Sequence, residues 1–388
     1  MKKRAGGNGY VARARLGCRA GALMVLALLA GCGGGDEGAR GVGEGGPETA
    51  AGGLNTSPAG TPSCEGDLVP EQPSGFGAYG YFGETRLLHR GNTDVQEQSL
   101  LTGEVKQLFD LADGRFVLPL VAADDRDVFA QDNSTIYRYS RATGNLSVFA
   151  KPPAAGEVPT LAGDLRFLVT LGLSDTNVFT LLYDAADLNV QDLSVRRAYV
   201  AVYDRATAAL RTFPALAPME QTVLLAPWNQ RLLQIRAVDI IPDPGISGFA
   251  GSVAVYDTAT GAVQPFLESP NTLTKKNYAF WGDDFVAVMA PEGGPDRQLV
   301  RVPLSGGART VLVGDVSEQD LAVLGDKAYV TLSVPDPGGG SHPQLTEVDL
   351  AGGSTTPVGS CQGKAFYATD ASLLVSDPRR GALVRLRR

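Results

Sequence analysis

The sequence predicts an all-β protein, and three observations lead to this fold class. Glycine and proline are abundant, with 48 Gly and 24 Pro in 388 residues, which argues against long uninterrupted helices and favours many turns. One hairpin pattern returns seven times along the chain, and a second strand–turn–strand pattern lies between its copies. Four strands in a repeat of about 46 residues are typical of a β-propeller blade. We expect seven four-stranded blades, with six or eight as alternatives and a β-sandwich or jelly roll as the competing fold.

The N-terminus has the features of a secretory signal. Six Lys and Arg residues and no Asp or Glu occur in residues 1–31. The apolar run 21–30 follows them, and it is shorter than the roughly 20 residues that a transmembrane helix needs. It ends in Leu29-Ala30-Gly31-Cys32, which resembles the bacterial lipobox. We therefore expect a lipoprotein signal peptide over 1–31, acyl chains on Cys32, and more than one chain for stable anchoring.

A tether and a single domain are expected after the signal. Residues 33–63 contain 11 Gly in 31 residues and bury too little apolar surface to fold, so 32–63 is interpreted as a lipidated, flexible tether. We expect one propeller domain over 64–388. Removing the signal leaves 28 Lys and Arg against 42 Asp and Glu, a formal charge of −14. This charge disfavours nucleic acid and anionic lipid headgroups as partners.

The repeated hairpins carry most of the fold prediction. Each copy has a short alternating apolar strand, a polar turn and a second strand, and alternation indicates one buried and one wetter face. The copies are 95–109, 135–149, 201–213, 253–266, 299–312, 345–358 and 373–386. Their turns contain Gly103, Gly144, Ala208, Gly261, Gly307, Gly353 and Gly381. Glycine at these positions favours a tight turn with positive φ.

The segments Val253-AVYDTATGAV and Leu299-VRVPLSGGARTVL resemble blade hairpins of bacterial periplasmic propellers of the TolB-type and quinoprotein-like classes. With the lipobox, they are similar to propeller lipoproteins that act as binding scaffolds. The resemblance covers roughly residues 75 to 388 and implies a fold but no functional residue. With no Asp after Cys32, resemblance to lipoprotein sorting implies the outer membrane, facing the periplasm or the cell surface.

Two arrangements could close the ring. The pieces 364–369 and 373–386 form either the last strands of the final blade or its first three strands, with 67–72 supplying the fourth. In both, the N-terminal segment completes the final blade. Cys64 and Cys361 both fall at this seam, and exported proteins permit disulfides, so we expect a Cys64–Cys361 bond.

Long insertions suggest a binding face. The segments 174–196, 239–251, 290–297 and 335–343 are interpreted as connections between second and third strands, which would place them at one mouth of the channel. The candidate binding residues all lie in the first insertion: Asp175, Tyr183, Asp184, Asp187 and Asp192.

The sequence contains no recognisable catalytic or metal-binding motif. It has two His and four Cys, and no nucleophile elbow, phosphate-binding loop or zinc motif. We expect no catalytic residue, no cofactor and no metal. The preferred function is a lipid-anchored, non-enzymatic, monomeric module that binds or scaffolds an envelope protein, peptide or glycan. The alternative is an envelope glycan hydrolase or lyase with acidic residues at the channel mouth.

Overall fold

The computed structural model describes residues 64–90, 94–111, 120–132, 134–157, 163–189, 197–214, 222–228, 231–243, 246–273, 277–290, 297–317, 320–369, 372–378 and 380–387. All of them belong to one unit of the chain, Gly45–Arg388. The expected signal peptide, the tether and Cys32 lie outside the described residues. Within the described part of the chain, no helix is long and apolar enough to cross a membrane.

The described residues form antiparallel sheets. Within a sheet, consecutive strands of the chain are paired, and a new sheet then begins. The first three sheets are β2 (Gly77–Phe82), β3 (Thr85–His89), β4 (Asp94–Ser99) and β5 (Val105–Asp110); β6 (Leu120–Ala123), β7 (Asp127–Gln131), β8 (Ile136–Ser140) and β9 (Leu146–Ala150); and β10 (Leu165–Leu173), β11 (Asn177–Asp184), β12 (Ala198–Asp204) and β13 (Leu210–Pro214). A short 3-10 helix, η1 (Ala185–Asn189), follows β11.

The remaining strands repeat the same order. They are β14 (Thr222–Trp228), β15 (Arg231–Asp243), β16 (Ile246–Asp257) and β17 (Val263–Leu273); β18 (Tyr278–Trp281), β19 (Asp284–Met289), β20 (Arg297–Pro303) and β21 (Thr310–Val316); β22 (Ala322–Leu324), β23 (Lys327–Pro335), β24 (Ser341–Asp349) and β25 (Thr355–Pro357); and β26 (Lys364–Ala368), β27 (Ser372–Asp377) and β28 (Ala382–Arg387). One pair, Val316 with Leu332, joins β18–β21 and β22–β25 into a single sheet.

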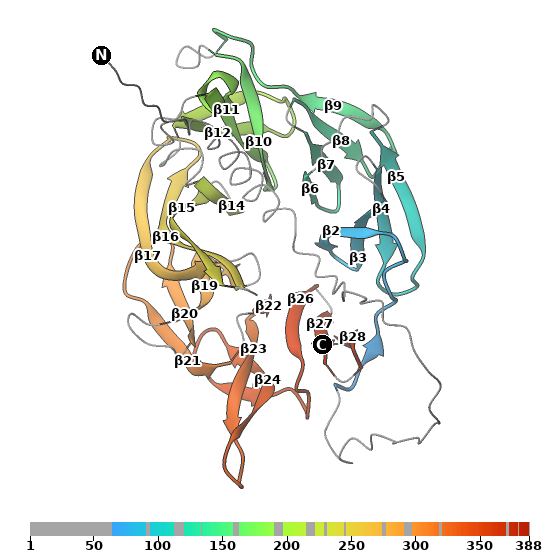
Figure 1. Ribbon diagram of the computed structural model, residues 1–388, viewed down its shortest axis with the longest axis vertical. Coiled ribbons are helices and arrows are strands. Elements are labelled where there is room, and N and C mark those ends of the chain that lie inside the picture. Colours follow the sequence, from blue (N-terminus) through green and yellow to red (C-terminus); the bar gives the residue numbers. More distant parts are fainter. Residues whose placement is uncertain are drawn as a thin grey trace, which may run out of the picture. The chain divides into compact units, whose positions relative to one another are not determined.

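Consecutive sheets lie next to each other in chain order (Figure 1). The first strands of neighbouring sheets are in contact, as in β2 with β6, β6 with β10, and β22 with β26. The last and first sheets also meet, because the rings of Tyr81 and Tyr367 lie 5.6 Å apart. The sheets therefore form a closed ring with their first strands innermost.

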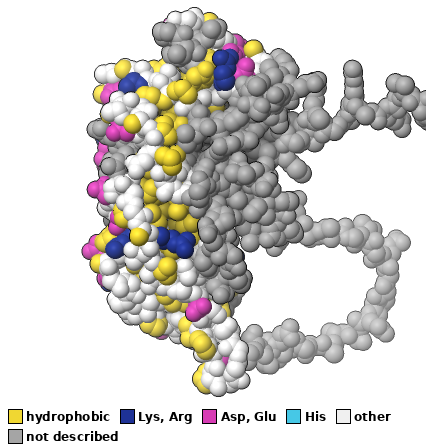
Figure 2. Space-filling view, turned by 90° about the vertical axis from the view of Figure 1, so that its left-hand side faces the viewer, with side chains coloured by type: hydrophobic (Ala, Val, Ile, Leu, Met, Phe, Trp, Pro, Cys, Tyr) yellow, Lys and Arg dark blue, Asp and Glu magenta, His cyan; other side chains and the backbone are white. Residues whose placement is uncertain are grey.

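Burial explains why the sequence folds in this way. Second strands such as β7 and β11 are almost fully buried, because both of their faces pack against neighbouring sheets. The cluster between the second and third sheets includes Phe129, Phe167 and Tyr203, all nearly inaccessible to solvent. Fourth strands face outward, and Leu146, Val148, Val263 and Val311 on them are exposed apolar side chains. Figure 2 shows hydrophobic side chains in a band along the described part of the surface that lies on the left of Figure 1.

The hairpin turns have the backbone conformation that the sequence predicts. All seven turn residues have positive φ, from 57° at Ala208 to 142° at Gly307. In most copies an aspartate begins the turn; Asp204, for example, accepts hydrogen bonds from the backbone amides of Ala206 and Thr207. Ala208 takes a conformation that favours glycine because these contacts fix the turn around it.

The N-terminal segment closes the ring as the fourth strand of the last sheet. β1 (Asp67–Leu68) pairs with β28 in the order β1-β28-β27-β26. This arrangement confirms the alternative in which the C-terminal pieces supply the first three strands. The segment also reaches the first sheet, because Gln98 donates a hydrogen bond of 2.8 Å to the carbonyl of Glu71.

The predicted disulfide between Cys64 and Cys361 is present, and it links residues separated by 297 positions. Both cysteines are buried in a cluster that includes Leu345, Val375 and Val384. The backbone amide of Cys64 donates a hydrogen bond to Asp377. The bond therefore joins the start of the domain to its last two sheets.

Antiparallel topology gives each sheet two ends. We call the end that carries the second-to-third turns and the connections between sheets the loop face, and the end that carries the first-to-second and third-to-fourth turns the turn face. Segments 239–251 and 335–343 lie between second and third strands, as the sequence predicts, whereas segment 174–196 was partly misassigned. Segment 174–196 includes the strand β11, and most of 239–251 extends the hairpin β15–β16. β15 and β16 are longer versions of the second and third strands that the other sheets contain. Between β11 and β12, the chain instead includes η1.

Candidate functional site

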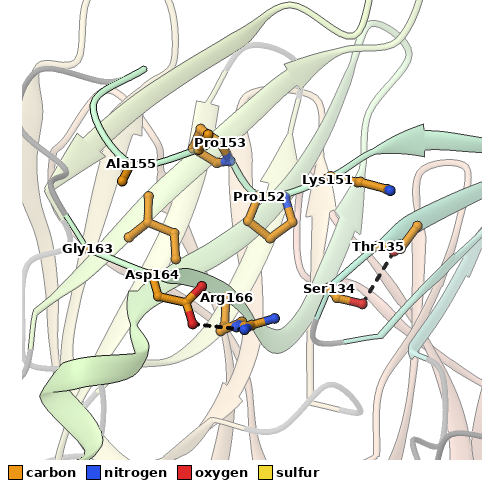
Figure 3. A pocket seen from close by; sticks show the side chains of 11 residues that line it. Ser134, Thr135, Lys151, Pro152, Pro153, Ala155, Gly163, Asp164 and Arg166 are labelled. Atoms are coloured by element: carbon orange, nitrogen blue, oxygen red, sulfur yellow. Dashed lines mark hydrogen bonds and ion pairs between the residues drawn. The ribbon is translucent and has the colours of Figure 1, made fainter.

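A cavity of about 630 Å³ opens on the loop face between the second and third sheets. We call it the loop-face cavity (Figure 3). Its walls come from the β7–β8 turn, the chain after β9, and the start of β10. The lining residues are Ser134, Thr135, Lys151, Pro152, Pro153, Ala154, Ala155, Gly163, Asp164, Leu165 and Arg166.

Two cationic side chains flank the loop-face cavity. In Figure 3, Lys151 lies beside Thr135, whereas Arg166 lies between Asp164 and Ser134. Arg166 donates a hydrogen bond of 2.8 Å to Asp164. Both side chains of this pair are about half exposed, so the pair contributes little to stability and leaves the guanidinium accessible.

Prolines and a buried tyrosine hold the chain that carries Lys151. Tyr203, 2% exposed, donates a hydrogen bond of 3.2 Å to the carbonyl of Lys151. Pro152 and Pro153 follow directly and fix the backbone torsions after it. The lysine therefore projects from a restrained segment.

The predicted binding residue Tyr183 lies next to Arg166 but does not line the cavity. It is the cross-strand partner of Arg166 in the β10–β11 ladder. Burial raises the pKa of Tyr183; the charge of Arg166 acts to lower this pKa and that of Asp164 to raise it. The phenol is therefore protonated at neutral pH.

Gly163 and Asp184 meet at the edge of the cavity. A Cβ atom on Gly163 would overlap the carboxylate of Asp184, so only glycine fits this position. Asp184 is 8% exposed and accepts a hydrogen bond from the amide of Ala186. Its function in this structure is to fix the start of η1.

The other predicted binding residues do not converge on one site. Asp187 lies in η1 and pairs with Arg197, Nε to Oδ2 at 3.5 Å. Asp175 lies in the β10–β11 turn on the opposite, turn face, where it pairs with Arg126 at 4.0 Å. These residues were expected to share one insertion and one face. Because β11 occupies 177–184, Asp175 and Asp187 instead lie at opposite ends of a strand. Asp192 lies outside the described residues.

Sequence reasoning missed Lys151 and Arg166. They belong to different sheets and fit no motif, so nothing in their spacing connects them. The only available signal was the Pro152-Pro153 pair after β9, which indicates a rigid connection. Propeller sites collect residues from separate sheets, and such sites have no linear signature.

Comparison with solved structures identifies proteins of similar fold. An oligogalacturonate lyase in complex with manganese matches with a TM-score of 0.52 at 14% identity, over 83% of this chain and 97% of that one. An oligogalacturonate lyase from Vibrio parahaemolyticus matches with a TM-score of 0.52 at 12% identity, over 81% and 91%. TolB from Acinetobacter baumannii matches with a TM-score of 0.36 at 11% identity, over 74% and 65%. No family model and no curated protein sequence matches the chain.

The manganese of one relative has no fitting donor set in the described part of this chain. Among the described residues, no group of three or more His, Cys, Asp or Glu is placed to hold a metal ion. Asp164 is the single carboxylate among the described lining residues of the loop-face cavity, and no imidazole joins it. Manganese prefers several oxygen or nitrogen ligands around one point, so the described lining of this cavity does not fit that ion.

The expectation of a non-enzymatic scaffold is wrong. The solved structures that match at a TM-score of 0.52 are those of lyases, which are enzymes. This finding favours the alternative of an envelope glycan hydrolase or lyase, although identities of 12% and 14% establish the architecture alone. The chain has an all-β, β-propeller-type fold.

Proposed function

We propose that this protein is an enzyme that cleaves an acidic oligosaccharide by β-elimination at the loop-face cavity. The observation that carries the proposal is the placement of Lys151, Arg166 and the carboxylate of Asp164 in the lining of one cavity. Two cations in one concave site favour a carboxylated ligand. The likeness in fold to oligogalacturonate lyases supports a uronic acid as that ligand.

The reaction assigns a task to each group. Elimination at a uronic acid removes the proton from C5 and breaks the bond between C4 and the glycosidic oxygen. The C–H electron pair becomes the C4=C5 double bond, and the departing oxygen takes a proton. Lys151 and Arg166 stabilise the negative charge that builds on the carboxylate. Asp164 accepts the C5 proton and then donates it to the departing oxygen.

A lyase fits the cavity better than a glycoside hydrolase does. Hydrolases of this kind use two carboxyl groups on either side of the scissile bond. The described lining of the cavity offers one, Asp164, and it lies against Arg166. Elimination needs one base and a stabilised carboxylate, which the described residues supply.

The same proposal includes the setting of the enzyme. The seven consecutive groups of four strands are the seven blades of a propeller, with β1 as the last strand of the seventh. The domain spans 64–388 and is held at the outer membrane by lipid on Cys32 through the tether 32–63. The order of basic residues, apolar run and Leu29-Ala30-Gly31-Cys32 supports this setting. Replacing Cys32 with Ala should move the protein from the membrane fraction to the soluble fraction.

Activity is tested with oligogalacturonates on the tether-free domain, residues 64–388. Elimination creates a conjugated, unsaturated uronate that absorbs ultraviolet light, whereas hydrolysis yields reducing ends without this absorbance. Arg166→Ala should lower kcat/KM by about 10²-fold or more, as is common when one charge-stabilising group is removed. Asp164→Asn should lower kcat by about 10²-fold or more with little change in KM.

Lys106→Ala is the matched control. Lys106 is an exposed cation on β5, outside the cavity, so its removal should leave kcat/KM unchanged. The absence of unsaturated product from every uronic acid polymer tested, or equal effects of Arg166→Ala and Lys106→Ala, would overturn the proposal. Reducing ends without absorbance would assign the cavity to a hydrolase instead.

A further inference from the structure

The two cationic residues of the loop-face cavity belong to different sheets. Lys151 directly follows β9, the fourth strand of the second sheet, whereas Arg166 lies on β10, the first strand of the third sheet. The placement of one side chain relative to the other therefore depends on how the boundary between these sheets is held. This placement matters for catalysis, because a displacement of about 1 Å can lower a rate by about 10²-fold.

Tyr203 lies at this boundary and contacts both sheets. It is a buried residue near the end of β12, in the third sheet. Its hydroxyl donates a hydrogen bond of 3.2 Å to the carbonyl of Lys151. Its ring centroid lies 6.3 Å from that of Phe167, which follows Arg166 on β10. One side chain therefore links the residue that carries the first cation to the neighbour of the second.

The ring of Tyr203 is fixed by aromatic contacts on both sides. Phe149, two residues before Lys151, lies edge to face with it, at 6.2 Å between centroids and 69° between ring planes. Phe167 approaches it at 73° from the third sheet. Edge-to-face pairs of this kind have a preferred geometry. Burial also raises the pKa of Tyr203, so the hydroxyl remains protonated and remains a donor at neutral pH.

The segment that carries Lys151 has few other ties to the third sheet. The amide of Ala154 donates to the carboxylate of Glu157 at 2.9 Å, and the amide of Glu157 donates to the carbonyl of Ala154 at 3.0 Å, so both bonds stay inside the segment. Pro152 and Pro153 stiffen it but have no N–H to donate. Within the described part of the chain, the bond from Tyr203 is the hydrogen bond that joins residues 151–157 to the third sheet.

Tyr256 provides a natural comparison at the next boundary. It is a buried residue of β16, in the fourth sheet, and its hydroxyl donates a hydrogen bond of 3.0 Å to the carbonyl of Pro214. Pro214 ends β13, the fourth strand of the third sheet. The two bonds are alike in position and in kind, because each joins a third strand to the end of the preceding fourth strand. Pro214 carries no charge and does not line the loop-face cavity.

We propose that Tyr203 is a positioning residue of the loop-face cavity, whose hydroxyl holds Lys151 where its ammonium group meets the carboxylate of a bound uronate. The inference rests on the proposed function, which supplies that carboxylate. Tyr203 acts through Lys151 and touches neither the ligand nor the reacting atoms. The hydrogen bond of Tyr256 has the same structural effect on its own boundary without an effect on the site.

The first test compares Tyr203→Phe with Tyr256→Phe in the tether-free domain. Each change removes one hydroxyl and retains the ring and its packing. Both variants should lower the midpoint of urea unfolding by similar amounts, because each leaves a carbonyl without its donor. Tyr203→Phe should also lower kcat/KM for oligogalacturonate elimination by about tenfold, whereas Tyr256→Phe should leave kcat/KM unchanged.

The second test measures binding without reaction. Galacturonate, the single sugar acid, has no second sugar on C4 and therefore cannot undergo the elimination, but it offers the same carboxylate. Calorimetry should show that Lys151→Ala weakens its binding by about tenfold and Tyr203→Phe by about threefold. The double variant Lys151→Ala/Tyr203→Phe should bind as Lys151→Ala alone does, because a hydroxyl that acts through Lys151 has no further effect once the ammonium group is absent.

The outcomes distinguish the two proposals. Equal loss of kcat/KM in Tyr203→Phe and Tyr256→Phe would overturn the positioning role, and so would a further loss of galacturonate affinity in the double variant. Galacturonate binding that follows the expected pattern, without elimination from any uronate oligomer, would overturn the proposed reaction alone. Failure of the parent domain to bind galacturonate or to release unsaturated product would overturn both.

Discussion

Arg205 reaches across the boundary between two sheets to bind Asp127. Its Nη2 atom lies 2.7 Å from Oδ2 of Asp127, and the two side chains are 5% and 2% exposed. Arg205 also pairs with Asp124, and Arg138 donates to Asp127 at 2.8 Å. The group formed by Asp124, Asp127, Arg138 and Arg205 therefore joins the second sheet to the third through buried charges.

Removal of this arginine should destabilise the domain. Arg205→Met should lower the free energy of unfolding by about 3 kcal/mol, because it leaves buried carboxylates with fewer partners. Urea unfolding of the tether-free domain measures the loss. Arg211→Met, at an exposed position on β13, is the control and should change stability by less than about 0.5 kcal/mol. Equal stability of the two variants would contradict this assignment.

The same group should make stability depend on acid pH. Burial acts to raise the pKa of Asp127, but hydrogen bonds from Arg138 and Arg205 outweigh it and hold this pKa below its ordinary value. At Asp124, too, burial acts to raise the pKa, but hydrogen bonds from Arg205 and from the backbone amides of Asp127 and Arg126 hold this pKa below its ordinary value. A depressed pKa contributes stability above the unfolded value, near 4, and this contribution is lost as the pH falls through the folded value. Urea unfolding between pH 6 and about 2 should show this loss, and Arg205→Met should reduce its slope.

The turn at Ala208 offers a stabilising substitution. Ala208 has φ of 57°, a conformation that costs a non-glycine residue about 1 kcal/mol. Ala208→Gly should therefore raise the free energy of unfolding, or leave it unchanged where the greater freedom of glycine in the unfolded chain offsets the gain. Ala206→Gly in the same turn, where φ is not positive, should lower stability. A larger loss at 208 than at 206 would contradict the argument.

The sequence predicts features that local chemistry determines. Turn positions follow from Gly, Asp and Thr in each hairpin, and even Ala208 could be placed by comparison with the other copies. The disulfide follows from two cysteines at the expected seam, Cys64 and Cys361. These predictions succeed because each of them depends on a short stretch of chain or on a single pair of residues.

The candidate site was harder to predict, for two physical reasons. The strand β11 is buried on both faces, so it has no polar alternation, and its apolar residues were included in an insertion. As a result Asp175 was assigned to the wrong face. Lys151 and Arg166 become neighbours of one cavity only when two sheets pack side by side, and no local pattern records that packing.

Ring closure should depend on the Cys64–Cys361 bond. The bond spans 297 residues, and in the chain-entropy model a loop of this length contributes about 4 to 5 kcal/mol. Replacing both cysteines with Ala in the tether-free domain should lower the free energy of unfolding by up to this amount, and a reducing agent should have the same effect on the parent domain. The double variant itself should be insensitive to the reducing agent.

The position of the bond also determines where the variant should fail first. β1 pairs with β28 through two residues, 67 and 68. Its exposed ion pairs from Asp67 to Arg385 and Arg387 contribute little, so this short strand should depend on the disulfide more than the longer strands do. Hydrogen exchange should therefore increase at β1 and β28 before it increases at β7 or β11. Uniform loss of protection across all sheets would show that the bond stabilises the ring as a whole, whereas loss confined to the last sheet would show that it acts as a local clasp on the N-terminal strand.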